Sequence, residues 1–305
     1  MTFHLKRYAP PMRPTEPARP GEPQQVRSPV LDTVPTGRRR RRQRQRSVAL
    51  VLAISLALPA CANLQGLKLL TPQSFGMERI APQVWIEREA DEVQRQALLS
   101  AVRVAEQRMR VVWGPPVSAP RVHACVSEGC YEAFGGQGSR AWIHGHEILL
   151  SPRGFNGDFL AHEWSHDEIR SRLGWRAWMA LPAWFDEGLA VAVSQAPEHD
   201  DGHWDWLAQQ QVPRPTRAQL MALRTQAQWL EGVRRWGEAD HAARRARGEP
   251  EIRPLYTAAG HEVRTWLAQG DPLALQRLLQ RLEDGTDFNT AYRLTDATAS
   301  SATGR

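Results

Sequence analysis

The pattern of apolar positions differs between the two halves of the chain. In the first half, short apolar runs predict strands at residues 84–86, 121–125 and 141–150. Between the first two runs, a stripe of apolar residues recurs at helical spacing: Leu98, Val102, Ala105 and Met109. This stripe predicts a helix over residues 91–110, which ends before Gly114-Pro115-Pro116.

The second half is patterned mainly for helices. Helical spacing covers residues 154–173, 181–194, 217–236 and 256–268, and a last helix that follows Asp271-Pro272. Gly174 is expected to end the first of these helices, and the polar segment 197–215 is expected to be a loop. A small α/β N-terminal lobe with a mixed sheet, followed by a mainly helical lobe, predicts an α+β fold.

The positive charge of the chain is concentrated near its start. The 305 residues carry a formal net charge of +6. Residues 1–46 hold twelve Lys/Arg and three Asp/Glu, a net charge of +9, which leaves −3 for the rest of the chain. A slightly acidic body does not favour a groove for phosphates, so no nucleic-acid partner is expected.

The first 61 residues are patterned as a targeting segment. Residues 1–46, rich in Pro and Arg, are expected to be a disordered leader. Residues 47–61 contain an uncharged apolar run of about 13 residues, shorter than the roughly 20 that a membrane-spanning helix needs. A basic stretch, a short apolar run and a small residue at its end are the layout of a secretory signal.

The end of this segment, Leu58-Pro59-Ala60-Cys61, resembles a bacterial lipoprotein box, although Pro59 departs from the usual pattern. The resemblance implies that Cys61 is lipidated and becomes the mature N-terminus, so that the protein is exported and anchored in the cell envelope. Ala62 stands where Asp would retain such a protein in the inner membrane, which favours the outer membrane. A plain signal peptide cleaved nearby or an uncleaved anchor remains the alternative.

The remaining domain spans residues 62–295, and the tail 296–305 is expected to be disordered. If Cys61 carries lipid, Cys125 and Cys130 form an even pair in an oxidising compartment, which favours a disulfide that closes a small loop. A zinc site is the alternative, but only His123 lies nearby as a further ligand.

The sequence His162-Glu163-Trp164-Ser165-His166 carries the strongest chemical signal. Two His at positions i and i+4 of a helix differ by about 40° around its axis, so both imidazoles face one way. That arrangement suits a single tetrahedral zinc ion, and Glu163, one position on, could accept a proton from zinc-bound water without being a ligand. A pair of helical His with no metal is the alternative.

A second segment, Leu181-Pro182-Ala183-Trp184-Phe185-Asp186-Glu187-Gly188, follows on the next expected helix. A catalytic zinc site needs three protein ligands and one open position, and Glu187 can supply the third ligand. The pairing of His-Glu-x-x-His with a downstream Trp-x-x-Glu-Gly resembles the gluzincin metallopeptidases and the peptidase MA-like group. The resemblance implies a zincin-like fold, with zinc held by His162, His166 and Glu187 and with Glu163 as the general base; Asp186 is the rival ligand.

The resemblance further implies a donor that stabilises the oxyanion, and Tyr256 is the best placed by order, with His261 and Tyr292 as rivals. Asp158 is a candidate to orient a zinc His, although it could equally be an acid at a helix N-terminus. His144 and His146 are expected on one face of a strand that could pair with a peptide. Four tryptophans near the motif are expected mostly as core residues: Trp164, Trp175, Trp178 and Trp184.

The leading hypothesis is therefore an exported, membrane-tethered zinc metallopeptidase. It would hydrolyse the bonds of a peptide or protein substrate through a zinc-activated water, with Glu163 as the base. The alternative is a catalytically silent zincin-fold module for binding or assembly in the cell envelope.

Overall fold

The computed structural model describes residues 67–270 and 272–294, and these residues lie in the second of two units, Ala57–Arg305. The predictions for residues 1–46, 47–61 and 296–305, including lipidation at Cys61, fall outside the described residues. Among the helices of the described part, none is both long enough and apolar enough to cross a membrane.

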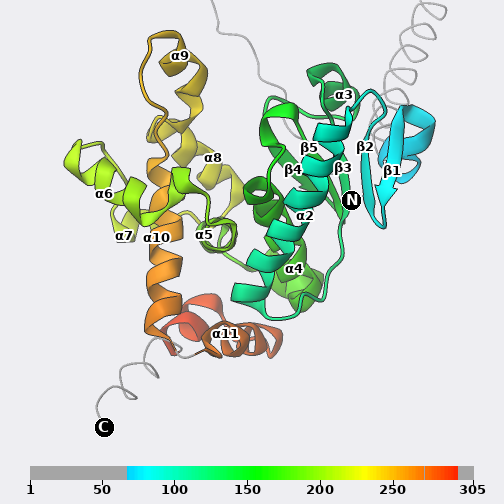
Figure 1. Ribbon diagram of the computed structural model, residues 1–305. Coiled ribbons are helices and arrows are strands. Elements are labelled where there is room, and N and C mark those ends of the chain that lie inside the picture. The colour runs from blue at the N-terminus through cyan, green and yellow to red at the C-terminus, as the bar shows by residue number, and fades with distance from the viewer. Residues whose placement is uncertain (1–66, 271, 295–305) are drawn as a thin grey trace, which may run out of the picture. The chain divides into compact units, whose positions relative to one another are not determined.

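A mixed sheet forms the first part of the fold (Figure 1). Its strands are β1 (Met77–Ala81), β2 (Val84–Glu87), β3 (Arg121–Ala124), β4 (Ala141–His144) and β5 (Glu147–Leu150), in the order β1-β2-β3-β5-β4. Strands β2, β3 and β5 run parallel, whereas β1 and β4 pair antiparallel at the two edges. A mixed sheet followed by helices confirms the α+β class.

The alternation of side chains along the strands gives the sheet two different faces. Val84, Val122 and Ile148, which pair across β2, β3 and β5, belong to the main hydrophobic core together with the helices. Trp85 and Leu149 belong to a smaller cluster on the other side. All four residues of β5 are buried, because this strand lies between two others and is covered on both faces.

The prediction of a single strand over residues 141–150 is wrong. Gly145, at φ +61°, and His146 form a turn that folds this apolar run into the antiparallel hairpin of β4 and β5. His144 therefore ends β4 and His146 lies in the turn, so the two residues do not share the face of one strand. The edge strand is β4, and β5, which directly precedes the motif helix in sequence, is internal.

Two long helices pack against each other beside the sheet: α2 (Glu92–Trp113) and α4 (Gly157–Met179) (Figure 1). The side chain of Asn156 begins α4 by accepting the N–H groups of Asp158 and Phe159, both at 3.0 Å. The predicted start at residue 154 is instead the 3₁₀ turn η2 (Pro152–Gly154). Gly174, at φ +67°, interrupts α4 where a stop was predicted, and a last helical stretch continues to Met179.

The helical part follows. Its helices are α5 (Ala183–Ser194), α6 (Asp201–Gln209), α7 (Arg217–Met221), α8 (Gln226–Arg235), α9 (His241–Ala246), α10 (Pro254–Gln269) and α11 (Ala274–Glu283). The predicted loop over residues 197–215 instead contains η3 (Pro197–His199) and α6, and the helix predicted over 217–236 is divided into α7 and α8. Five further elements were not predicted from the apolar pattern: β1, η1 (Pro72–Phe75), α3 (Glu128–Ala133), η4 (Glu238–Asp240) and α9.

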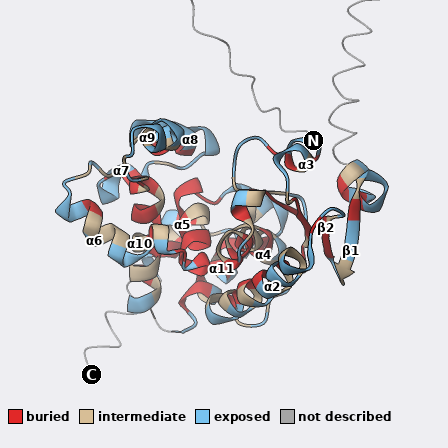
Figure 2. Ribbon diagram, turned by 45° about the horizontal axis from the view of Figure 1, so that its top comes forward, coloured by how far each residue is buried: buried red, intermediate tan, exposed pale blue. Residues whose placement is uncertain are grey.

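Helices α5 and α10 approach each other closely, and Figure 2 shows the buried residues gathered on α5 and on the parts of α4 and α10 around it. A Cβ atom on Gly188 of α5 would lie 2.7 Å from the carbonyl oxygen of Ala259 in α10, and one on Gly260 would lie 2.3 Å from Cγ1 of Val191. The two glycines thus let the backbones meet. The close approach at Gly188 is thus made with α10.

We expect Gly188→Ala to destabilise the protein by about 1–3 kcal/mol, because the added methyl group must push α5 away from Ala259. Urea unfolding monitored by circular dichroism measures the loss. Gly129→Ala in α3 is the matched control, since a Cβ there meets no atom within 4 Å. Equal stability of the two variants would contradict the packing argument.

Candidate metal centre

Three possible ligand atoms from two helices converge on one point. His162 and His166 project from α4, and Glu187 projects from the first turns of α5. The two Nε2 atoms lie 3.3 Å apart, and Oε2 of Glu187 lies 3.5 Å from Nε2 of His162 and 3.8 Å from Nε2 of His166. The side chains are only 12–15 % exposed. The structure thus brings together the three residues expected as ligands.

These spacings fit a tetrahedral zinc ion. Zinc binds His nitrogen and carboxylate oxygen at about 2.0–2.2 Å, which sets neighbouring ligand atoms of a tetrahedron about 3.3–3.6 Å apart. Two imidazole nitrogens and one carboxylate oxygen are also a donor set that suits this metal. Three protein ligands leave a fourth position open.

Asp186 and Glu187 are adjacent in sequence but have different partners. Successive residues of a helix point about 100° apart. Oδ1 of Asp186 lies 3.0 Å from Nδ1 of His166, so the carboxylate accepts the proton on Nδ1, and Nε2 is the ring atom that faces Glu187. Asp186 is therefore placed to orient the candidate ligand His166 and not to be a ligand itself.

The start of α5 is held in place by a distant segment. The N–H groups of Ala183 and Trp184 donate to the carbonyl oxygens of Arg224 and Leu223, which follow α7. These bonds use donors that the first turn of a helix leaves without partners. They also fix the position from which Asp186 and Glu187 reach α4.

The carboxylates around the two imidazoles create a strong attraction for positive charge. Burial by itself would lower the pKa of His166, but the charge and hydrogen bond of Asp186, followed by the charges of Glu187 and Glu163, raise this pKa to about 10. Burial also raises the pKa of Glu163, although the two His oppose the shift. A metal cation would satisfy the same negative charge in place of a proton.

A cavity of about 440 Å³ adjoins this group and connects it with Tyr256. His162, Glu163 and Tyr256 all line the cavity, and the rings of His162 and Tyr256 lie 6.2 Å apart. Burial and then the charge of Glu187 hold the pKa of Tyr256 well above its ordinary value, so its hydroxyl stays a hydrogen-bond donor. Tyr256 is therefore the candidate oxyanion donor that the fold brings to the motif.

The two rivals of Tyr256 lie elsewhere. His261 stacks on Trp204, with ring centres 4.4 Å apart, and its Nδ1 lies 3.1 Å from Oδ1 of Asp201. The hydroxyl of Tyr292 donates to Glu262 at 3.1 Å. Neither residue lines the cavity.

His199, in η3, is a cavity residue that the sequence analysis missed. Its ring stacks on Tyr256 with centres 5.6 Å apart, and burial lowers its pKa to about 4. The side chain is therefore neutral at physiological pH. The only signal in the sequence is a His in a segment that was expected to be a loop.

The other candidate residues contact partners away from His162, His166 and Glu187. Asp158 forms an ion pair with Arg108 and does not orient a ligand, which corrects that expectation. His146 contacts Asp167, with Nδ1 and Oδ1 2.8 Å apart. The tryptophans expected as core residues lie outside the cavity lining: Trp164, Trp175, Trp178 and Trp184. Of these four, Trp175 is 53 % exposed and thus not a core residue.

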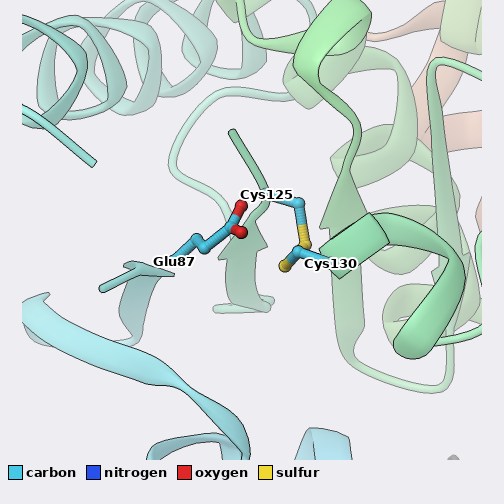
Figure 3. A group of neighbouring side chains, drawn as sticks. All are labelled: Glu87, Cys125 and Cys130. Atoms are coloured by element: carbon cyan, nitrogen blue, oxygen red, sulfur yellow. A yellow bond between two sulfur atoms is a disulfide. The ribbon is translucent and has the colours of Figure 1, made fainter. Parts of the chain in front are cut away.

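A second group of possible ligands contains Glu87, Cys125 and Cys130 (Figure 3). The two cysteines are joined as a disulfide, with Cα atoms 5.5 Å apart, as the sequence favours. The carboxylate of Glu87 accepts the N–H groups of Val126 and Ser127, both at 2.8 Å. The two sulfurs are bonded to each other, and the carboxylate of Glu87 is occupied by backbone donors. These three residues therefore stabilise a turn and do not form a metal site.

Comparison of the chain with protein-family models, curated proteins and solved structures finds no match.

We expect the purified protein to bind one zinc ion and His162→Ala or His166→Ala to abolish binding. Glu187→Gln should weaken binding strongly because it removes the anionic ligand. Asp186→Asn should weaken it by about 10–100-fold, since a partner of a ligand is lost. Competition with a chromogenic chelator measures the affinities.

His261→Ala is the matched control and should keep full zinc affinity, because His261 pairs with Asp201 away from the centre. Full occupancy in either motif His variant would show that the ligand set is different.

Proposed function

We propose that this protein is a zinc-dependent metallopeptidase of the gluzincin type. The observation that carries the proposal is the convergence of His162, His166 and Glu187, with ligand atoms 3.3–3.8 Å apart, beside a cavity that Glu163 also lines. A zinc ion held by these residues would acidify a water molecule and polarise the scissile carbonyl. The resemblance of both segments to the gluzincins supports the same conclusion.

Each neighbouring side chain has a distinct part in this reaction. Glu163 accepts the proton of the attacking water and passes it to the leaving amine. Asp186 holds His166 in the tautomer that a ligand needs. The hydroxyl of Tyr256 donates to the oxygen of the carbonyl as negative charge develops on it. These roles use only groups that line the cavity or contact a ligand.

The substrate would be an extended peptide or a protein segment. The cavity begins at Gly138–Ala141, where the edge strand β4 starts, and reaches the motif helix. An edge strand leaves backbone N–H and C=O groups free to pair with an added strand. Export and a lipid anchor at Cys61 complete the proposal; they rest on the leader sequence.

We expect Glu163→Gln to keep zinc and lose at least about 10²-fold in turnover, because it removes the general base but no ligand. The measurement combines zinc content with the hydrolysis of an internally quenched peptide library, with and without chelator. Wild-type protein that binds zinc but cleaves no peptide would favour the silent binding module. Loss of zinc in Glu163→Gln, with retention in Glu187→Gln, would reverse the two roles.

We expect Tyr256→Phe to keep zinc and to lower kcat by about 10²-fold with a smaller change in KM, since the donor acts on charge that develops in the transition state. Steady-state kinetics on one cleaved peptide separate the two constants. Tyr292→Phe is the matched control, because its hydroxyl contacts Glu262 outside the cavity. Equal kcat values for both variants would exclude Tyr256 as the donor.

A further inference from the structure

Arginines form much of the cavity wall beyond Tyr256. Arg140 precedes β4, Arg245 reaches in from α9, and Arg253 precedes α10. They come from segments far apart in the sequence, yet all three line the same cavity as His162 and Glu163. A substrate bound in this cavity during the reaction would therefore lie against the arginines of the wall.

These three guanidinium groups share two carboxylates. Arg140 binds Glu198 at 2.6 Å and Glu251 at 3.0 Å. Arg253 also binds Glu251, at 2.9 Å, and Arg245 binds the other oxygen of the same carboxylate. One positive charge is left over, and both oxygens of Glu251 already have donors.

Polar atoms of the wall are also left without partners. Among the described residues, Nε of Arg253 is buried and has no hydrogen-bond partner, and the same holds for Oε1 of Glu198 and Oε2 of Glu238. Arg245 makes a single ion pair, through Nη1, and its side chain is 53 % exposed. A guanidinium has five N–H donors in a planar fork that matches a carboxylate. The wall can therefore accept an additional group that is anionic and rich in acceptors.

The remaining carboxylates of the cavity do not offset this surplus. Oε1 of Glu238 accepts the N–H groups of Leu255 and Tyr256 at the start of α10, and burial raises the pKa of Glu238 to about 8, so it is largely uncharged at neutral pH. Glu163 lies beside the candidate ligands. The other cavity arginine, Arg153, pairs with Glu128 and donates to the backbone at Gly138, so it is engaged elsewhere.

We propose that Arg245 and Arg253 form a subsite that binds a carboxylate of the peptide substrate, either an Asp or Glu side chain near the scissile bond or the C-terminal carboxylate. The inference rests on the proposed function, because it names the substrate class of that same site. With this subsite the protein would be a peptidase selective for acidic peptides, although residues 47–305 carry a net charge of −3.

The test uses the zinc-loaded full chain and matched quenched peptides that carry Glu, Gln or Lys beside the cleaved bond, each with a free or an amidated C-terminus. We expect kcat/KM to be about 10–100-fold higher for a carboxylate-bearing peptide than for its amide counterpart, the range for a charged hydrogen bond. The Glu peptide with an amidated end and the Gln peptide with a free end distinguish the two sources of the carboxylate.

Variants of α9 show which residue is responsible. Arg245→Gln should abolish the preference, and Arg245→Glu should reverse it toward the Lys peptide, a gain that a misfolded protein cannot show. Arg247→Gln is the matched control, because the side chain of Arg247 is exposed and pairs with Glu249. This variant should keep the preference. An unchanged preference in Arg245→Glu would overturn the proposal.

Binding separates this inference from the proposed function. Equal cleavage of the Glu, Gln and Lys peptides, irrespective of their C-termini, would overturn the subsite and leave the peptidase. If no peptide is cleaved, calorimetry of the zinc-loaded Glu163→Gln chain with the same peptides decides. Tighter binding of the carboxylate peptides would then support the subsite while the peptidase proposal fails, and equal or absent binding would overturn both.

Discussion

The carboxylates of Asp186 and Glu187 lie on a helix whose other residues are all buried, and such groups require compensating positive charge. Part of it comes from His166 of α4, whose Nδ1 contacts Asp186 and whose Nε2 faces Glu187. Nε2 of His162 also faces Glu187. The raised pKa of His166 expresses the same attraction. A divalent cation at the meeting point would satisfy all of these groups at once, and the proposed chemistry depends on this arrangement.

This convergence is maintained by contacts that lie outside the centre. Glu168 of α4 is fully buried and accepts the N–H groups of Val117 and Ser118, which attaches the motif helix to the segment between α2 and β3. On the other side, Gly188 lets α5 rest directly on α10, the helix that carries Tyr256. The candidate ligands and the candidate donor thus lie on packed helices, which keeps their separations constant.

The cavity wall differs from the candidate metal centre in the number of elements that supply its residues. It is assembled from β4, η3, α9 and α10, and its ion pairs join residues distant in the sequence, such as Arg140 with Glu198 and Glu251, 58 and 111 positions away. These pairs connect the sheet part with the helical part directly beside the proposed reaction centre. Discrimination among substrates would therefore depend on the polar groups that join the two parts.

Features that follow from local geometry could be predicted from the sequence. The i, i+4 spacing of His162 and His166 places both rings on one side of any helix, and the apolar stripes predicted α2, α10 and α11 because their periodicity is long and regular. Glu187 could be named only through the partner segment and its resemblance, since the distance between two helices is not a local property.

Other features depend on how the chain packs and could not be predicted from local patterns. The run 141–150 is apolar throughout, so its pattern could not show that Gly145 folds it into a hairpin, and α6 has a single buried residue, Leu207, and hence little periodicity. Asp158 pairs with Arg108, 50 positions earlier, instead of a motif His. His199 reaches the cavity by stacking on Tyr256. For Asp158 and His199 the deciding partner is distant along the chain, and such contacts depend on how the elements pack, which local patterns do not encode.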